Sequence, residues 1–416
     1  MIFRFFLILL SFQMVPWLGT IPYVGYVIDY YEQLMDWIVN FGNRHFFHVK
    51  DVLVPPNGSG DTSYGWAELW TTLSLSLVGS IIWSLFDRKR LNYIHLNYWL
   101  CLCTRYYVAL VAFTYGFDKV LPLQMPFPNM HQLATPLGDF LPMRLSWMFI
   151  GYSGPYQVFS GFMEVFAGLL LLYRRTATLG VLMATGVFIN VMMLNLSYDI
   201  PVKIFSMQMV LICLFLLANE GKRMFYFFVL NKPAALCSLY FFTYPKLWMR
   251  ITRVILKLAF IVFAIILPFY NNYGFYKSLS HAGDKKQPVK NGVYEVTVYA
   301  VNGHQLPLAV SDTMRWQDVI FENGLGSART ADTAFRQRYR RGYFAYEEDS
   351  VTHILAFKNP LSQNTIANFR YEAPDTSIIR LWGLEHSDSL YIELKKTNRH
   401  FQLAEKQFHW LSEANR

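Results

Sequence analysis

Charged residues are scarce in this 416-residue chain, where Asp, Glu, Lys and Arg make up 16% of the sequence against 54% hydrophobic and 18% aromatic residues. A soluble domain usually contains about 25% charged residues, so the composition excludes an ordinary soluble globular protein. Cysteine is scarce as well: the four cysteines form no C-x-x-C pair, which argues against a thiol–disulfide relay. Internal repeats and low-complexity tracts are also lacking.

Long apolar runs are abundant in the sequence. A helix needs about 20 apolar residues to cross the roughly 30 Å hydrocarbon core of a bilayer. The sequence contains seven such stretches, at about 3–21, 67–86, 98–120, 154–173, 176–197, 202–219 and 251–271. It therefore predicts an α-helical polytopic membrane protein with about seven spans. The first stretch has some features of a signal peptide, but no clear cleavage site follows it, which favours an uncleaved span.

Lys and Arg cluster beside alternate spans. The groups DRKRLN (87–92), YRR (173–175) and EGKRMF (220–225) each follow an even-numbered span. Since loops rich in Lys and Arg stay in the cytoplasm, this pattern places the N-terminus in the cytoplasm and the C-terminal region outside. Topology then explains the formal net charge of +9, and we expect no binding of nucleic acid.

The segments between the spans have compositions of their own. Residues 21–47 show a helical apolar period with aromatics, which predicts a helix in the outer interface. Asp61 precedes the second span and is a candidate N-cap of that helix, with a substrate role as the alternative. Residues 121–147 are rich in Pro, Met and Leu, which predicts a lid or re-entrant cap over the bundle. Residues 223–250 are typical of an interfacial hairpin.

From about residue 288 the pattern changes to short strands. GVYEVTVYAVNG alternates β-favouring residues and ends in Asn302-Gly303, a hairpin signal. Further strands follow, and residues 398–416 have a helical pattern, so the region predicts a small β-sandwich with a terminal helix. Its basic run Arg336–Arg341 is either a surface for anionic head groups or a protein partner, or a solvated edge strand guarded by cations.

One carboxylate, Glu164, interrupts the fourth apolar run. Small residues lie three and four positions away on both sides, so its side chain is expected to face another helix and not lipid. The third span carries a matching small-residue stripe with a cation at each end, Arg105 and Lys119. We expect an Arg105–Glu164 pair, which would cost about 3–5 kcal/mol to break. The alternative is substrate or proton handling, because ionisable groups inside a membrane usually mark a site.

Acids and bases also gather at the outer end of the predicted bundle. They are Asp118 and Lys119 at the end of the third span, Asp199 and Lys203 in the turn between the fifth and sixth, and Asn190 and Asn195 on the fifth. Under an apolar cap they would form the polar end of a pocket, where a desolvated Lys can act as a base. The alternative is that they are snorkelling and capping residues at helix ends. The candidate catalytic residues are Lys119 and Asp118, the candidate ligand-binding residues are Glu164, Arg105, Asp199, Lys203 and Asn190, and no metal site is predicted.

Residues 98–220 resemble the DoxX-type four-helix membrane domain. The stretches RYYVALVAFTYGFDKV and SGFMEVFAGLLLLYRRTATLG follow its pattern of an Arg opening one helix, Gly-x-x-Lys closing it, then Glu, an apolar run and Arg-Thr. The arrangement is also similar to the HTTM domain of vitamin-K-dependent carboxylase-like proteins. The whole chain looks like the long DoxX-family proteins of Bacteroidetes-type bacteria. The resemblance matches Lys119 to the closing Lys, Glu164 to the acid and Arg175-Thr176 to the basic stop.

This resemblance implies a role linked to quinones or lipids. Some DoxX relatives are membrane subunits of thiosulfate:quinone oxidoreductases, and others are assembly factors or cargo receptors. In the carboxylase relatives a Lys is the base of vitamin K hydroquinone chemistry, and a β-rich outer domain follows the helices. This chain reads Phe188-Ile189 where that pattern has Phe-His, and it has no haem-type His pair in its spans and no flavin fingerprint. A complete redox enzyme in one chain is therefore not expected.

The predicted organisation has four parts: a two-span hairpin (1–97), the DoxX/HTTM-like bundle (98–220), a cytoplasmic hairpin with the last span (221–276) and a periplasmic β-rich domain (277–416). The leading hypothesis is a bacterial inner-membrane protein that binds a quinone or another lipid in an apolar cavity near Lys119 and Asp199. If it is an enzyme, it would be a quinone-linked oxidoreductase subunit or carboxylase-like. The alternative is a non-enzymatic envelope scaffold or assembly factor that captures a protein partner through the C-terminal domain.

Overall fold

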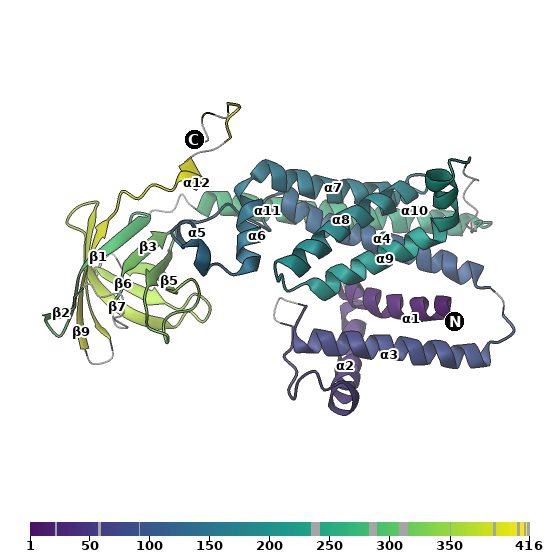
Figure 1. Cartoon of the computed structure of the whole chain (residues 1–416), viewed down its shortest axis with the longest axis horizontal. Coiled ribbons are helices and arrows are strands. Elements are labelled where there is room, and N and C mark those ends of the chain that lie inside the picture. The colour runs from purple at the N-terminus through teal and green to yellow at the C-terminus, as the bar shows by residue number, and fades with distance from the viewer. Residues whose placement is uncertain are drawn as a thin grey trace. The chain divides into compact units, whose positions relative to one another are not determined.

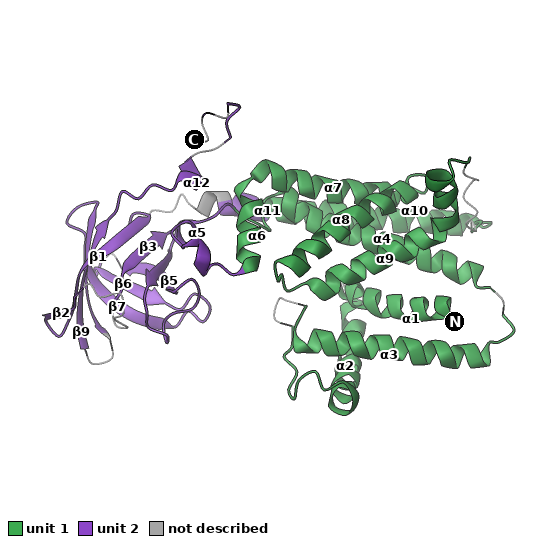
Figure 2. Ribbon diagram, viewed as in Figure 1, with its two compact units in different colours: residues 1–126, 142–274 green, residues 127–141, 275–416 purple. Residues whose placement is uncertain are grey.

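The chain divides into two compact units in the computed structural model (Figures 1 and 2). Unit 1 contains residues 1–126 and 142–274, and unit 2 contains residues 127–141 and 275–416. The structure describes residues 1–20, 23–56, 60–90, 92–233, 242–282, 289–307, 315–349, 351–385, 388–405, 408–411 and 413.

Seven helical segments of the described chain are long and apolar enough to cross a membrane, which confirms the prediction of about seven spans. They are Ile2–Gly19, Ser63–Phe86, Ile94–Val120, Gly154–Leu172, Ala177–Ser197, Lys203–Val229 and Leu247–Leu279. In Figure 1 they contain α1 (Ile2–Met14), α3 (Ser63–Phe86), α4 (Ile94–Val120), α7 (Gly154–Leu172), α8 (Ala177–Ser197), α9 (Lys203–Met224), α10 (Leu247–Ile261) and α11 (Leu267–Ala282). Between the first two spans a further helix, α2 (Gly25–Gly42), forms within the segment expected to be helical.

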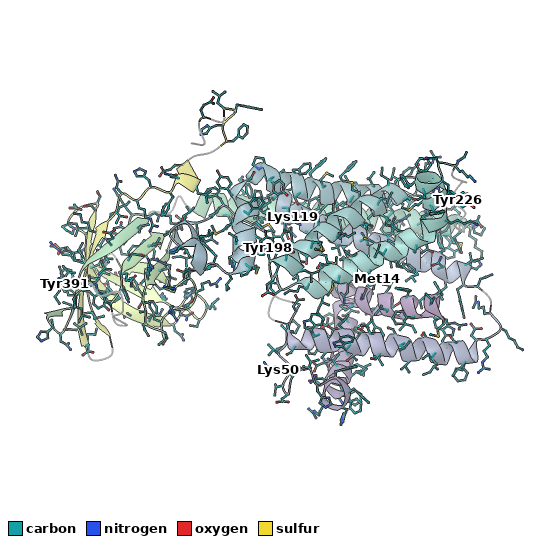
Figure 3. The ribbon with its side chains drawn as sticks, in the orientation of Figure 1. Met14, Lys50, Lys119, Tyr198, Tyr226 and Tyr391 are labelled. Atoms are coloured by element: carbon teal, nitrogen blue, oxygen red, sulfur yellow. The ribbon has the colours of Figure 1, made fainter. Side chains whose placement is uncertain are left out.

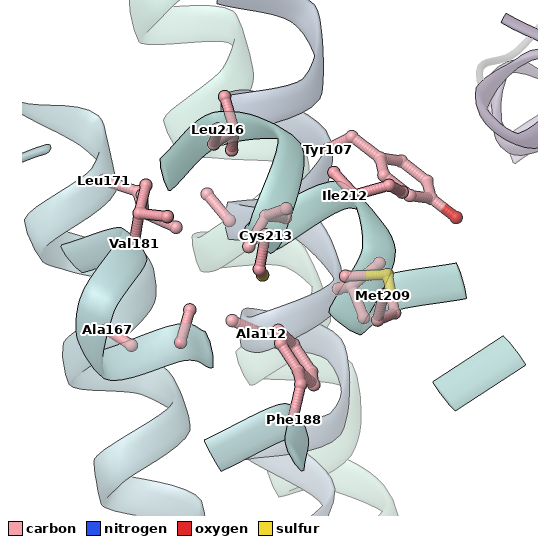
Figure 4. Close-up of a cluster of buried hydrophobic side chains, with 14 of the residues drawn as sticks. Tyr107, Ala112, Ala167, Leu171, Val181, Phe188, Met209, Ile212, Cys213 and Leu216 are labelled. Atoms are coloured by element: carbon pink, nitrogen blue, oxygen red, sulfur yellow. The ribbon is translucent and has the colours of Figure 1, made fainter. Parts of the chain in front are cut away.

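The core of unit 1 is built around α4, whose apolar window is 56% buried, the largest share of any span. Its partner α7 runs antiparallel to it: Gly161 lies against Gly116, and Gly168 lies against the ring of Phe113. Without side chains at these glycines the two backbones approach closely, as expected for helices packed in a membrane. Leu171 of α7, Val181 and Phe188 of α8, and Met209, Ile212 and Cys213 of α9 complete the cluster (Figure 4).

Asp61 is not the cap of α3, as the sequence suggested. Thr62 has that role, because its hydroxyl accepts a hydrogen bond from the Gly65 amide. The Asp61 carboxylate instead reaches the start of α9, where it accepts hydrogen bonds from the amides of Lys203 (2.7 Å) and Ile204 (3.0 Å). A carboxylate at a helix N-terminus satisfies free amides and interacts favourably with the helix dipole. Asp61 therefore ties the loop before α3 to α9.

Unit 2 is a closed antiparallel barrel of eight strands, and the predicted β-sandwich is wrong. The strands are β1 (Gly292–Val301), β3 (Asp318–Glu322), β4 (Leu325–Arg329), β5 (Arg341–Asp349), β6 (Ile354–Lys358), β7 (Thr365–Glu372), β8 (Ile378–Glu385) and β9 (Asp388–Lys396). From β3 onward each strand pairs with the next, and pairing of β1 with both β3 and β9 closes the ring. The short β2 (His304–Gln305) extends β1 through a hairpin whose turn residues, Asn302 and Gly303, both have positive φ, as predicted.

Aromatic side chains fill the inside of the barrel. Phe344 and Phe357 stack with ring centroids 3.9 Å apart, and Trp316 stacks on Phe357. Phe321 and Phe369 complete the same buried cluster. The predicted terminal helix is confined, among the described residues, to α12 (Gln402–Glu405).

Residues 127–141, expected to form part of a cap over the helix bundle, belong to unit 2 instead. The short helix α5 (Met130–Leu133) begins with a capping box formed by Asn129 and Gln132. The Met130 amide donates a hydrogen bond to the Glu322 carboxylate (2.9 Å), and His131 Nδ1 lies 2.8 Å from Ser327 Oγ. The segment is held by polar contacts to β3 and β4 that its apolar composition did not reveal.

Candidate functional site

A buried ion pair joins α4 and α7. Lys119 Nζ lies 2.5 Å from Glu164 Oε1, and the two residues are 7% and 1% exposed. The sequence correctly placed Glu164 on the face toward another helix, but the expected Arg105–Glu164 pair is wrong, because the partner is Lys119. Figure 3 shows Lys119 at the end of unit 1 opposite Tyr226.

Helix geometry explains why Lys119 is the partner. Gly161 is level with Gly116, and Gly168 with Phe113, so Glu164 lies at about the level of residue 115. Ten residues of helix, about 15 Å, separate that level from Arg105. Side chains on a helix also point toward its N-terminus. Lys119 therefore points toward Glu164, whereas Arg105 points away from it.

The remaining candidates at this end make contacts of their own. Asp118 accepts a hydrogen bond from Asn272 of α11 (2.7 Å). Asp199 and Asp61 both pair with Lys203, at 2.7 and 3.5 Å. Asn195 donates to the Val202 carbonyl, whereas Asn190 is exposed on α8. The group around Lys203 thus connects the α8–α9 turn to the loop before α3, whereas the Lys119–Glu164 pair connects α4 to α7.

A cavity of about 900 Å³ lies in unit 1 near Arg105, and the other six candidate residues do not line it. Its walls come from the first half of α4, the α7–α8 turn, the end of α9, residues 242 and 244, and α10. Its position differs from the expected one near Lys119 and Asp199. The cavity was not foreseen because its residues come from five separate spans and the segment before the last span.

The lining combines aromatic surface with positive charge. Trp99, Tyr106, Phe242, Tyr244, Trp248 and Phe260 supply aromatic walls. Five cations line it: Arg105, Arg174, Arg175, Arg253 and Lys257. The acid in the lining, Glu220, pairs with Arg223 at 3.1 Å. The sequence did show these features, in the YRR cluster (173–175) and the aromatic segment 223–250, but they were interpreted as signs of membrane topology.

Arg105 is the cation whose position favours ligand binding most. Its guanidinium carbon lies 5.4 Å from the Tyr106 ring centroid, and its buried Nε has no hydrogen-bond partner among the described residues. A buried donor without a partner carries a free-energy cost that an acceptor on a ligand would remove. Within the described residues no cluster of three or more His, Cys, Asp or Glu side chains is placed to hold a metal ion.

The basic run Arg336–Arg341 is only partly a surface. Arg341 is 2% exposed and pairs with Asp318, and its Nε donates to Ser327 Oγ at 2.7 Å. Arg340 pairs with Asp139 at 3.2 Å, while Arg336 and Arg338 are exposed. Two members of the run therefore help hold β5 and residues 127–141 in unit 2.

Comparison with known proteins finds a relative of part of the chain. No protein-family model matches the chain, and no solved structure matches it. A stretch of 119 residues, 29% of this chain, is 33% identical to the uncharacterized protein YwoB of Bacillus subtilis (strain 168) and covers 75% of that protein. The chain therefore belongs to the same protein family as YwoB.

Proposed function

We propose that unit 1 binds a lipid-like amphiphile, either a membrane lipid or a quinone, in the cavity beside Arg105. The head group would lie against the cations, and the apolar part would lie between the aromatic side chains of α4 and α10. The observation that carries this proposal is a cavity of about 900 Å³ with five cations in a mostly aromatic and aliphatic wall. Ligand sites commonly combine an apolar lining with a few polar groups that fix orientation.

The charge of the lining favours an anionic head group. Five cations face one acid, which already has Arg223 as its partner. Arg binds phosphate and carboxylate oxygens through two parallel hydrogen bonds, so a phospholipid fits this wall better than a neutral quinone ring. The resemblance to DoxX-type domains implies the same general class of ligand. Quinone binding stays within the proposal as the second ligand to test.

The test is extraction of the purified full-length protein, followed by mass spectrometry of lipids and quinones. The variant is Arg105→Met, which keeps an apolar chain similar to the aliphatic part of Arg and removes the guanidinium. The matched control is Lys222→Met, a cation near the same end that is exposed and does not line the cavity. Thermal unfolding in detergent shows whether both variants remain folded.

We expect a defined lipid to copurify at near-stoichiometric amount with wild type and Lys222→Met, and at several-fold lower amount with Arg105→Met. If a quinone is enriched in the same pattern, the cavity is the binding site and its ligand is a quinone and not a phospholipid. Equal amounts in a folded Arg105→Met variant, or no enrichment above bulk lipid in wild type, would contradict the proposal.

A further inference from the structure

Several polar atoms on α7 and just after α4 are buried without a hydrogen-bond partner among the described residues. Gln157 is 0% exposed, and neither its Oε1 nor its Nε2 has a hydrogen-bond partner among the described residues. The same holds for Glu164 Oε2 and for Gln124 Oε1, just after α4. These atoms, together with Lys119, are called the polar track below. It lies away from the cavity beside Arg105 and shares no lining residue with it.

The members of the polar track follow one another along the helix interface. Gln157 and Glu164 lie on the face of α7 that also carries Gly161, the glycine packed against α4. Because Gly161 lies beside the Val120 amide, Gln157 is level with the residues after α4, where Gln124 lies. The backbone N–H of Gln124 donates to the Asp118 carbonyl (3.0 Å), which keeps Gln124 beside the end of α4. The track thus runs inward from Gln124 through Gln157 to Glu164.

A direct hydrogen bond cannot connect Gln157 with Glu164. Gln157 and Glu164 are two helical turns apart, about 10 Å along the axis. A buried amide or carboxylate without a partner is strongly unfavourable in an apolar environment, and more so where lipid surrounds the helices. Buried polar groups of this kind usually bind internal water, which makes about three hydrogen bonds to them.

We propose that water molecules occupy the interface between α4 and α7, connect Gln124, Gln157 and Glu164, and let the Lys119–Glu164 pair exchange protons with the aqueous phase at that end of the bundle. In the exchange step a hydronium ion gives one proton to Glu164 Oε2, the carboxylate becomes a carboxylic acid, and a water molecule is released. Lys119 then keeps its positive charge without a counter-charge, so the ion pair opens. The track makes this buried pair a proton-sensitive contact.

The experiment compares cysteines at two neighbouring positions in the full-length protein in phospholipid vesicles. Gln157→Cys places a thiol on the track, and Phe159→Cys places one at nearly the same depth on the lipid-facing side, where Phe159 is 58% exposed. A cationic methanethiosulfonate reagent reacts with thiolates, which form only where water is present. Peptide mass spectrometry separates these sites from the native cysteines.

We expect the new thiol of the Gln157→Cys variant to react at least about tenfold faster than that of the Phe159→Cys variant. Equal or slower reaction at position 157 would overturn the proposal. Gln157→Leu is a second variant that decides the question if the cysteine variant does not fold. In a hydrated track its melting temperature should be equal to or below that of wild type, because the amide already has partners. A higher melting temperature would show that the amide is buried dry, and the proposal would be wrong.

Discussion

Each unit of the protein contains a deeply buried cation–carboxylate pair, and the two pairs have different surroundings. In the barrel, Arg341 pairs with Asp318, and its guanidinium also donates to the hydroxyl and the carbonyl oxygen of Ser327. In the helical unit, Lys119 contacts one oxygen of Glu164, and the other oxygen has no partner among the described residues. The Arg341–Asp318 pair is embedded in a hydrogen-bond network, whereas the Lys119–Glu164 pair has a carboxylate oxygen that could accept further hydrogen bonds.

This difference indicates different roles. A buried pair whose remaining donors and acceptors are satisfied mainly fixes the geometry around it. A pair with an unpartnered oxygen can still bind water, a proton or a ligand atom. We therefore interpret Arg341–Asp318 as a structural element of the barrel and Lys119–Glu164 as a contact that responds to its surroundings.

The largest effect is expected for Arg341→Met. The substitution leaves the Asp318 carboxylate and the Ser327 carbonyl without their buried partner, so the free energy of unfolding of the barrel should fall by about 3–5 kcal/mol. Hydrogen–deuterium exchange of the β3, β4 and β5 peptides in the full-length protein measures it. The control is Arg336→Met, an exposed residue of the same basic run, for which we expect a change below about 0.5 kcal/mol. Similar changes in both variants would contradict the structural role of Arg341.

A somewhat smaller effect, about 3 kcal/mol, is expected for Lys119→Met, because the stranded Glu164 carboxylate can take up a proton. Thermal unfolding in detergent measures the loss. The double variant Lys119→Met/Glu164→Gln removes both charges and should recover most of the stability. In the barrel, Arg341→Met/Asp318→Asn should recover less, because the Ser327 carbonyl still lacks the guanidinium that donates to it. Equal recovery of stability in the two double variants would contradict the proposed difference between the two ion pairs.

The sequence predicted features that depend on local patterns better than features that depend on long-range contacts. The seven spans and the hairpin at Asn302-Gly303 follow from continuous apolar runs and turn residues, which are local signals. Barrel closure depends on pairing of β1 with β9, where Thr297 contacts Glu393, 96 residues away. A sandwich and a barrel share the same short strands, so the sequence could not separate them.

The candidate site shows the same limit. The small-residue stripe correctly placed Glu164 at a helix interface, but choosing between Arg105 and Lys119 required the relative height of α4 and α7. That height is set by the packing of Gly116 on Gly161, which is a tertiary contact. The cavity is likewise assembled from separate helices. The sequence named Arg105 as a candidate ligand-binding residue, but the position of the cavity beside it became known only from the structure.

A third prediction concerns acid sensitivity in unit 2. Burial and the neighbouring Arg341 lower the pKa of His131 to about 4. The unfolded state therefore binds a proton that the folded state does not, and stability should fall as the pH drops from about 6.5 to about 4. The loss should be smaller than that of Arg341→Met, because only the packing of α5 depends on neutral His131. Hydrogen–deuterium exchange of the peptide 127–141 at several pH values measures this loss of stability.

The control for His131 has to account for Glu322, which lies 3.8 Å from His131 Nε2. Burial raises the pKa of Glu322, so its titration acts in the opposite direction. The comparison is therefore made in a Glu322→Gln background, where the amide oxygen can still accept from Met130. His131→Asn can keep the contact to Ser327 and cannot titrate, so its peptide should lose the acid-induced exchange. If that exchange persists, His131 is not its cause.

The smallest effect is expected at Lys203, which has two acidic partners of unequal importance. The side chain of Asp61 is buried and caps α9 through two backbone amides, so Asp61→Ala should cost about 1 kcal/mol. Asp199 pairs with Lys203 at a shorter distance, but its side chain is 81% exposed, so losing that pair should cost at most a few tenths of a kcal/mol. The matched change there is Asp199→Asn, because φ is +50° at this residue and Asn tolerates that conformation. Thermal unfolding in detergent ranks the two variants. A larger loss for Asp199→Asn would mean that the ion pair, and not the helix cap, connects α9 to the loop before α3.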